Sequence, residues 1–104
     1  MKIPYQPSKS EIRLTSILHA LSDPNRLRIV QCLGKRKESH CSYYQTLNVS
    51  KSTLSHHFKV LREAGVIKVR IEGTQHFYSL RIEDLEELFP GLLPAVLNIN
   101  EELL

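Results

Sequence analysis

Residues 50–67 read Ser-Lys-Ser-Thr-Leu-Ser-His-His-Phe-Lys-Val-Leu-Arg-Glu-Ala-Gly-Val-Ile, and this stretch decides the fold. Ser50 is a favoured N-cap and Gly65 a favoured helix end, so the stretch predicts a helix over residues 51–64. One face of this helix would pack on a core through Leu54, His57, Phe58 and Leu61. The opposite face carries polar or basic side chains and no acid, namely Ser52, Ser55, His56 and Lys59.

A short helix and a hairpin are predicted on either side of this helix. Upstream, a helix from Ser39 to about Leu47 and a turn at Asn48 would complete a helix-turn-helix. Downstream, the apolar period changes from 3.6 to 2 over residues 67–72, Gly73 supplies a turn, and residues 75–80 form the return strand. A hairpin directly after a helix-turn-helix is a winged helix.

Two more helices are predicted before the helix-turn-helix. Ser8 and Glu11 have the spacing of a capping box, ahead of an apolar stripe at Leu14, Ile17, Leu18 and Leu21. Asp23 and Pro24 would begin a second helix, and Gly34 is expected to end it.

The last part of the chain predicts helix as well. Pro90-Gly91 would interrupt it, and Pro94 is expected to break the short helix that follows. The expected fold is therefore mainly α with a β-hairpin wing (α+β), in the order α-α-α-α-β-β-α. Residues 1–104 would form a single winged helix-turn-helix domain.

Composition indicates a globular protein with an uneven charge. The chain has 104 residues, of which 41% are hydrophobic, and this length suits one domain. No apolar run approaches the roughly 20 residues of a membrane span, and no secretory signal is present, so we expect a cytoplasmic protein without a membrane partner. Residues 1–80 hold 13 of the 14 Lys and Arg but only five of the 11 acids. Such a basic body favours a polyanionic partner.

The helix over residues 51–64 and the hairpin together supply candidate contacts to double-stranded DNA. Hydroxyls, imidazole and ammonium groups without acids suit a major groove, and a helix N-terminus suits phosphate. A basic hairpin can follow the backbone or enter a minor groove, although it can also be a solvated edge. The predicted DNA contacts are Ser50, Lys51, Ser52, Thr53, Ser55, His56, Lys59, Arg70 and Gln75.

Two other classes of function are alternatives to DNA binding. A winged helix can instead bind protein, but such a module usually lacks the basic polar face that residues 52–59 retain. An enzyme is not indicated, because the sequence has no glycine-rich phosphate loop and no nucleophile motif. We therefore predict no catalytic residue.

Three stretches together resemble the arsenic-repressor (ArsR/SmtB) family of small bacterial winged-helix repressors. They are Leu-Ser-Asp-Pro-Asn-Arg-Leu-Arg-Ile-Val at residues 21–30, the quoted residues 50–67, and Glu-Gly-Thr-Gln-His-Phe-Tyr-Ser-Leu at residues 72–80. The resemblance covers roughly residues 10–89. It implies a homodimer held by the first and last helices, about residues 8–22 and 82–104. It also implies a twofold-symmetric operator and release from DNA by an inducer.

The metal sites of that family are not matched here. The arsenic and cadmium sensors of the family carry Cys-x-Cys where this chain has Ser39-His40-Cys41. The zinc sensors of the family use Asp and His on the last helix, whereas residues 82–104 of this chain contain no His. We expect no metal site and no cofactor, although His40 and Cys41 could bind a metal with ligands from elsewhere in a dimer. His57 is expected to be a core-side histidine with its polar atoms satisfied.

The two cysteines remain candidates for a redox sensor. Cys41 follows a basic cluster at residues 35–37, a setting that favours a reactive thiolate, and Cys32 lies on the preceding predicted helix. The alternative is that both are inert, small apolar side chains. The inducer is unknown from the sequence.

Overall fold

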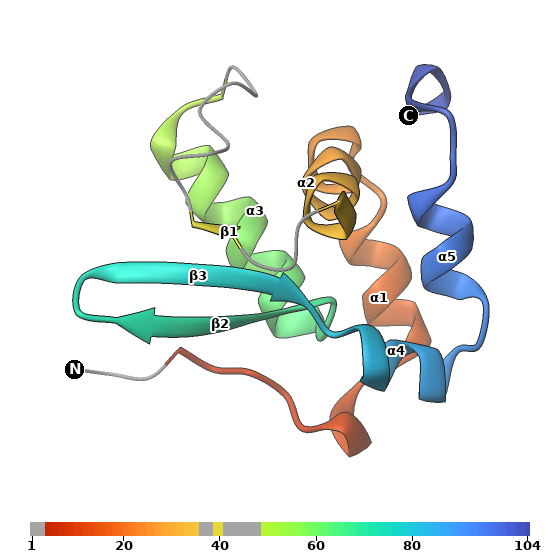
Figure 1. The fold of residues 1–104 in the computed structure, drawn as a ribbon, viewed down its shortest axis with the longest axis horizontal. Helices are drawn as coiled ribbons and strands as arrows, with labels where there is room; N and C mark the ends of the chain where they lie inside the picture. The colour runs from red at the N-terminus through yellow and green to blue at the C-terminus, as the bar shows by residue number, and fades with distance from the viewer. Residues whose placement is uncertain (1–3, 36–38, 41–48) are drawn as a thin grey trace.

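Apart from the predicted third helix, the helices and the hairpin follow the predicted order in a computed structural model, which describes residues 4–35, 39–40 and 49–104. A helical body lies at one end of a hairpin that extends away from it (Figure 1). Two 3₁₀ turns, Lys9–Glu11 and Glu101–Leu103, lie near the ends of the chain. The other elements are α1 (Leu14–Ala20), α2 (Pro24–Lys35), β1 (Ser39–His40), α3 (Lys51–Ala64), β2 (Ile67–Glu72), β3 (Gln75–Leu80), α4 (Ile82–Leu88) and α5 (Leu92–Leu97).

Helix α3 has the bounds that the sequence predicts. The Ser50 hydroxyl accepts a hydrogen bond from the Thr53 N–H, which caps the first turn. Gly65 ends the helix at a φ of 96°, in the left-handed region that favours glycine. A Cβ atom built on Gly65 would lie 2.7 Å from Cγ1 of Ile12, so this position also lacks room for a side chain.

Gly65→Ala is expected to lower the free energy of unfolding by about 2–4 kcal/mol, because it adds a steric clash to a strained φ. Gly73, at the hairpin turn, is the matched control: its φ is also positive, at 60°, but no atom lies within 4 Å of a built Cβ. Gly73→Ala should cost only about 1 kcal/mol. Urea unfolding of both variants measures the difference, and equal costs would contradict the close packing at Gly65.

The sheet contains one strand that the sequence analysis missed. Its order is β1-β3-β2, with both pairs antiparallel, and Ser39 and His40 pair with Tyr78 and Phe77 of β3. The prediction that a helix begins at Ser39 is therefore wrong. Pairing with β3 gives the free edge of that strand a partner, which local sequence does not reveal. The rest of the predicted helix, over residues 41–47, lies outside the described residues.

The first helix is shorter than predicted. The Glu11 carboxylate accepts hydrogen bonds from the Ser8 N–H and hydroxyl, both at 2.9 Å, but this cap closes only the 3₁₀ turn. Helix α1 begins at Leu14. Of its predicted apolar stripe, Ile17 and Leu21 are buried, whereas Leu14 and Leu18 are 44% and 50% exposed.

Two predicted helix breaks are also wrong. Helix α2 continues through Gly34 to Lys35, and a Cβ atom on Gly34 would lie 2.6 Å from Leu97 of α5. Glycine at this position thus permits close packing of the two helices and does not end the first one. Helix α5 runs through Pro94 to Leu97, because Pro94 is its third residue, where a backbone N–H has no partner within the helix.

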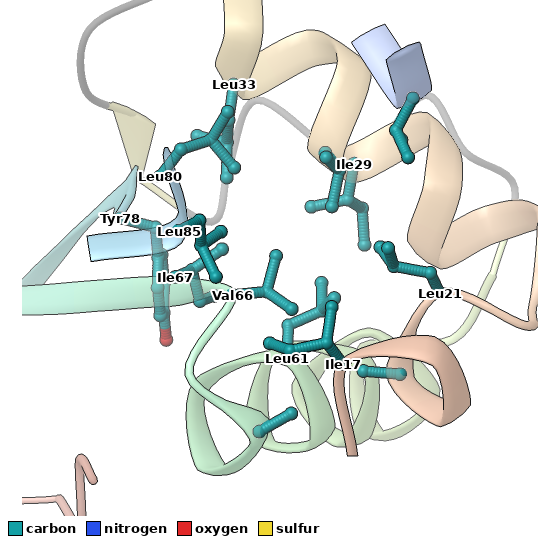
Figure 2. Close-up of a cluster of buried hydrophobic side chains, with 14 of the residues drawn as sticks. Ile17, Leu21, Ile29, Leu33, Leu61, Val66, Ile67, Tyr78, Leu80 and Leu85 are labelled. Atoms are coloured by element: carbon teal, nitrogen blue, oxygen red, sulfur yellow. The ribbon is translucent and has the colours of Figure 1, made fainter. Parts of the chain in front are cut away.

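The core joins the helical body to the base of the hairpin. Side chains of α1, α2, α3, the hairpin and α4 converge on one cluster, drawn in Figure 2 with labels on Ile17, Leu21, Ile29, Leu33, Leu61, Val66, Ile67, Tyr78, Leu80 and Leu85. Phe58 of α3 stacks on Tyr78 of β3, with ring centroids 4.2 Å apart. Helix α3 and the hairpin are therefore held in a fixed relation to each other. Among the described residues, every helix is too short or too polar to span a lipid bilayer.

Candidate nucleic-acid interface

Helix α3 separates its side chains into a buried face and an exposed face, as predicted. Leu54, His57, Phe58 and Leu61 are buried. Ser52, Ser55, His56 and Lys59 are exposed. We call these four exposed residues the α3 face. It combines two hydroxyls, an imidazole and an ammonium group, which can hydrogen-bond to base edges or phosphates.

The first turn of α3 is organised by its own hydroxyl groups. Besides accepting the Thr53 N–H, the Ser50 hydroxyl donates to Thr53 Oγ1 at 2.9 Å and lies 3.2 Å from the Ser52 hydroxyl. Ser50 and Thr53 thus have a structural role that the sequence analysis recognised only for Ser50. Lys51 is exposed beside them, so all of the predicted contact residues in this turn lie at the surface.

On the hairpin, Arg70 is oriented by two neighbours that the sequence analysis did not single out. Its Nη1 lies 2.8 Å from a carboxylate oxygen of Glu72, and its guanidinium lies 4.6 Å from the ring centroid of Phe77. Residues 70 and 72 share one strand face, and Phe77 pairs with Arg70 across the ladder. Gln75 is exposed next to the turn. Arg70 and Gln75 therefore both belong to the exposed surface of the wing.

A short N-terminal segment covers the outer edge of β2. The Gln6 side-chain amide donates to the Val69 carbonyl at 3.3 Å and accepts from the Val69 N–H at 3.0 Å, as a neighbouring strand would. Arg62 of α3 and Arg81 donate to the carbonyls of Tyr5 and Pro7. These bonds fasten the N-terminal segment to the hairpin and to α3, and the sequence contained no signal for them.

His57 is buried, as predicted, and its partner is Arg26 of α2. The side chain is 5% exposed, and its Nδ1 lies 3.2 Å from Arg26 Nη1. Because a guanidinium only donates, Nδ1 must accept, so the ring is neutral with its proton on Nε2. Burial lowers the pKa of His57; Arg26 and His56 lower it further, whereas Asp23 opposes them.

Asp23 stabilises the start of α2 beside this contact. Its carboxylate accepts the N–H groups of Asn25 and Arg26, at 2.8 and 3.1 Å. Burial alone would raise the pKa of Asp23, but these hydrogen bonds and the nearby positive charges outweigh it and lower the pKa. Hydrogen bonds thus link the start of α2 to α3 through Arg26.

Comparison with known proteins agrees with this architecture. A family model described as "Bacterial regulatory protein, arsR family" matches residues 23–69. The arsenical resistance operon repressor of Staphylococcus xylosus is 37% identical over 89 residues, which is 86% of this chain and 84% of that protein. The chain belongs to the ArsR family. The resemblance seen in the sequence is confirmed, and so is the winged-helix fold.

Other relatives of this ArsR-family regulator have related descriptions. The uncharacterized HTH-type transcriptional regulator YceK of Bacillus subtilis (strain 168) is 39% identical, covering 86% of this chain and 90% of that one. The structure of HlyU from Vibrio cholerae N16961 superposes with a TM-score of 0.59 at 30% identity, covering 72% of this chain and 89% of that one. The family consists of DNA-binding transcriptional regulators and not enzymes, in agreement with the prediction from the sequence.

Of the two cysteines predicted as candidate sensors in this ArsR-family chain, the structure describes one. Cys32 of α2 is a free, half-buried thiol packed against the core. Cys41 lies outside the described residues, so the redox pair stays a prediction. Among the side chains that the structure describes, in residues 4–35 and 49–104, no three of His, Cys, Asp or Glu are grouped so that they could hold a metal ion.

Proposed function

We propose that this ArsR-family regulator is a homodimeric repressor that binds a twofold-symmetric operator and leaves it in response to a signal. The α3 face would lie in the major groove, and Arg70 and Gln75 of the wing would contact the adjacent backbone or minor groove. The observation that carries the proposal is that the α3 face is exposed and free of acids, while the opposite face of the same helix is anchored in the core. The site of action would be the cytoplasm, where bacterial DNA lies.

Exposed apolar side chains support a dimer. Leu14 and Leu18 of α1 are 44% and 50% exposed, and Ile99 and Leu103 near the C-terminus are 40% and 78% exposed. Large exposed apolar side chains at a surface are often covered by a protein partner. A dimer through these segments would present two copies of α3, and its half-sites would lie about one DNA turn, roughly 34 Å, apart or a small multiple of that.

A binding titration on the DNA directly upstream of this protein's own gene tests the proposal. We expect binding to this duplex to exceed binding to a scrambled duplex of equal length by at least about a thousandfold at the same salt concentration. The titration is repeated with reduced protein, after peroxide, and with zinc or arsenite, since release in one condition identifies the signal. If the intact protein neither binds this duplex specifically nor selects a sequence from a randomised library, the proposal is wrong, and protein binding becomes the better interpretation.

Lys59→Ala is expected to weaken binding to every duplex and to reduce the slope of log Kd against log salt by about one unit. The reason is that one phosphate contact, with its released counterion, is lost. Lys35→Ala is the matched control, because Lys35 is exposed at the end of α2, outside the predicted DNA contacts and outside the segments of the proposed dimer interface. Fluorescence anisotropy across a salt series measures both slopes. An unchanged slope for Lys59→Ala would exclude Lys59 as a phosphate contact.

A further inference from the structure

We propose that Arg26 and His57 are positioning residues for DNA binding: their hydrogen bond fixes the orientation of α3 on α1 and α2, and thereby sets the affinity of the α3 face for DNA. The inference rests on the proposed function and adds to it two residues that lie behind the interface. His57 is buried, so it acts through the helix that carries it and not by touching DNA.

The Arg26 guanidinium joins three helices. Its Nε donates to the carbonyl of Ala20, the last residue of α1, at 2.7 Å. Its Nη1 reaches His57 Nδ1 on α3 at 3.2 Å. Arg26 itself lies in the first turn of α2, where its N–H is bonded to Asp23. A single planar group thus ties α3 to the corner between α1 and α2.

The choice of histidine at position 57 is informative. The other buried positions of this face, Leu54, Phe58 and Leu61, are apolar, and an apolar residue at 57 would avoid the cost of burying a polar group. Apolar packing holds α3 against the core through the shapes of its side chains, and a hydrogen bond adds a contact that requires a defined direction. Residues 55 and 56 precede His57 directly, so a rotation of α3 about its axis moves the α3 face.

The bond also predicts how pH acts on DNA binding. Protonated His57 could only donate, as Arg26 does, so the two groups would repel each other and the bond would be lost. The charged or titratable groups that face His57 are Asp23 and Arg26 from the start of α2 and His56 from α3 itself. Because burial, with Arg26 and His56, lowers the pKa of His57 from its ordinary value of 6.5, the bond is intact at pH 7.5 and is lost only as the pH falls through that lowered pKa.

The adjacent His56 is the other imidazole of α3, and it is exposed on the α3 face. Replacing His56 with glutamine leaves His57 as the one histidine of this helix. A pH effect on DNA binding that depends on position 57 can then be assigned by changing His57 in the same background.

The test uses the full chain and a duplex that the wild-type protein has selected from a randomised library at pH 7.5. Kd is measured at constant ionic strength in steps from pH 7.5 down to the lowest pH at which circular dichroism shows the protein folded, for His56→Gln and for His56→Gln combined with His57→Asn. Asparagine keeps an acceptor near the place of Nδ1 and cannot be protonated. We expect His56→Gln to bind about tenfold more weakly at the acid end of this range than at pH 7.5, and the double variant to change less than about twofold. An equal loss in both variants would overturn the inference.

Arg26→Lys gives a second test, independent of histidine. A lysine cannot bridge Ala20 and His57 with a planar fork, so DNA affinity should fall about tenfold at pH 7.5. Circular dichroism and sedimentation verify that the variant is folded and assembled as the wild type is. Arg28→Lys is the matched control, since Arg28 donates to Asn25 at 3.3 Å and forms an ion pair with Glu101 at 3.8 Å, and neither partner lies on α3. Wild-type affinity of a folded Arg26→Lys would overturn the inference, whereas failure of the wild type to select any duplex would overturn the proposed function itself.

Discussion

Leu18→Glu should convert the protein into monomers and lower its affinity for the operator by about 100-fold or more. The side chain of Leu18 is 50% exposed on α1, and in the proposed dimer it is covered by the partner. A carboxylate there would be buried without a counter-charge, which costs more than an apolar contact returns. DNA affinity falls when the dimer is lost. The second copy of α3 is held at a high effective concentration near its half-site only when the two copies are joined.

Sedimentation velocity measures the first effect and a DNA titration the second. Wild-type protein should sediment at about twice the chain mass of 12.0 kDa, and Leu18→Glu near 12.0 kDa. Thr74→Glu is the control for assembly, since it adds the same charge at an exposed position of the hairpin turn, outside the segments of the proposed dimer interface. A Leu18→Glu variant that stays dimeric and binds normally would show that α1 does not form the interface.

Phe58→Ala should lower the free energy of unfolding by about 3–5 kcal/mol, the cost typical of an aromatic core side chain. Phe58 is 1% exposed and stacks on Tyr78, so its removal leaves a cavity between α3 and the hairpin. Phe58→Leu keeps most of the apolar volume and should cost less than half as much. Lys59→Ala, one residue along and exposed, should change stability by less than about 0.5 kcal/mol.

Urea unfolding monitored by circular dichroism measures all three variants. A cost for Phe58→Ala as small as that of Lys59→Ala would contradict the packing described for α3. Because the same contact holds the hairpin against α3, the surviving folded fraction of Phe58→Ala should also bind DNA more weakly. That loss should be smaller in Phe58→Leu.

The features predicted correctly from the sequence are those with local causes. The bounds of α3 follow from the cap at Ser50 and from Gly65, and its two faces follow from helical periodicity. The hairpin follows from alternation over residues 67–72, a turn at Gly73 and an aromatic-rich return strand. These signals span only a few residues, so they could be recognised without any knowledge of the rest of the chain.

The features that were missed join distant parts of the chain. Arg26 and His57 are 31 residues apart, and Gln6 and Val69 are 63 residues apart. The strand at Ser39 and His40 depends on the free edge of β3, and the need for a glycine at position 34 comes from the close approach of Leu97 of α5. Each depends on tertiary packing, which overrides the local preference of a serine to cap a helix or of a glycine to end one.

A selection from a randomised DNA library, carried out with the wild type, Ser55→Ala and His56→Ala, tests the central claim most directly. If the α3 face reads bases, each variant stays folded and loses preference at one or two base pairs, repeated symmetrically in both half-sites. Each loss should correspond to about 1–3 kcal/mol of discrimination. Ser10→Ala, remote from α3 in the sequence and exposed, should select the wild-type sequence. Selection of the wild-type sequence with undiminished stringency by both Ser55→Ala and His56→Ala would contradict the assignment of the α3 face as the surface that reads DNA.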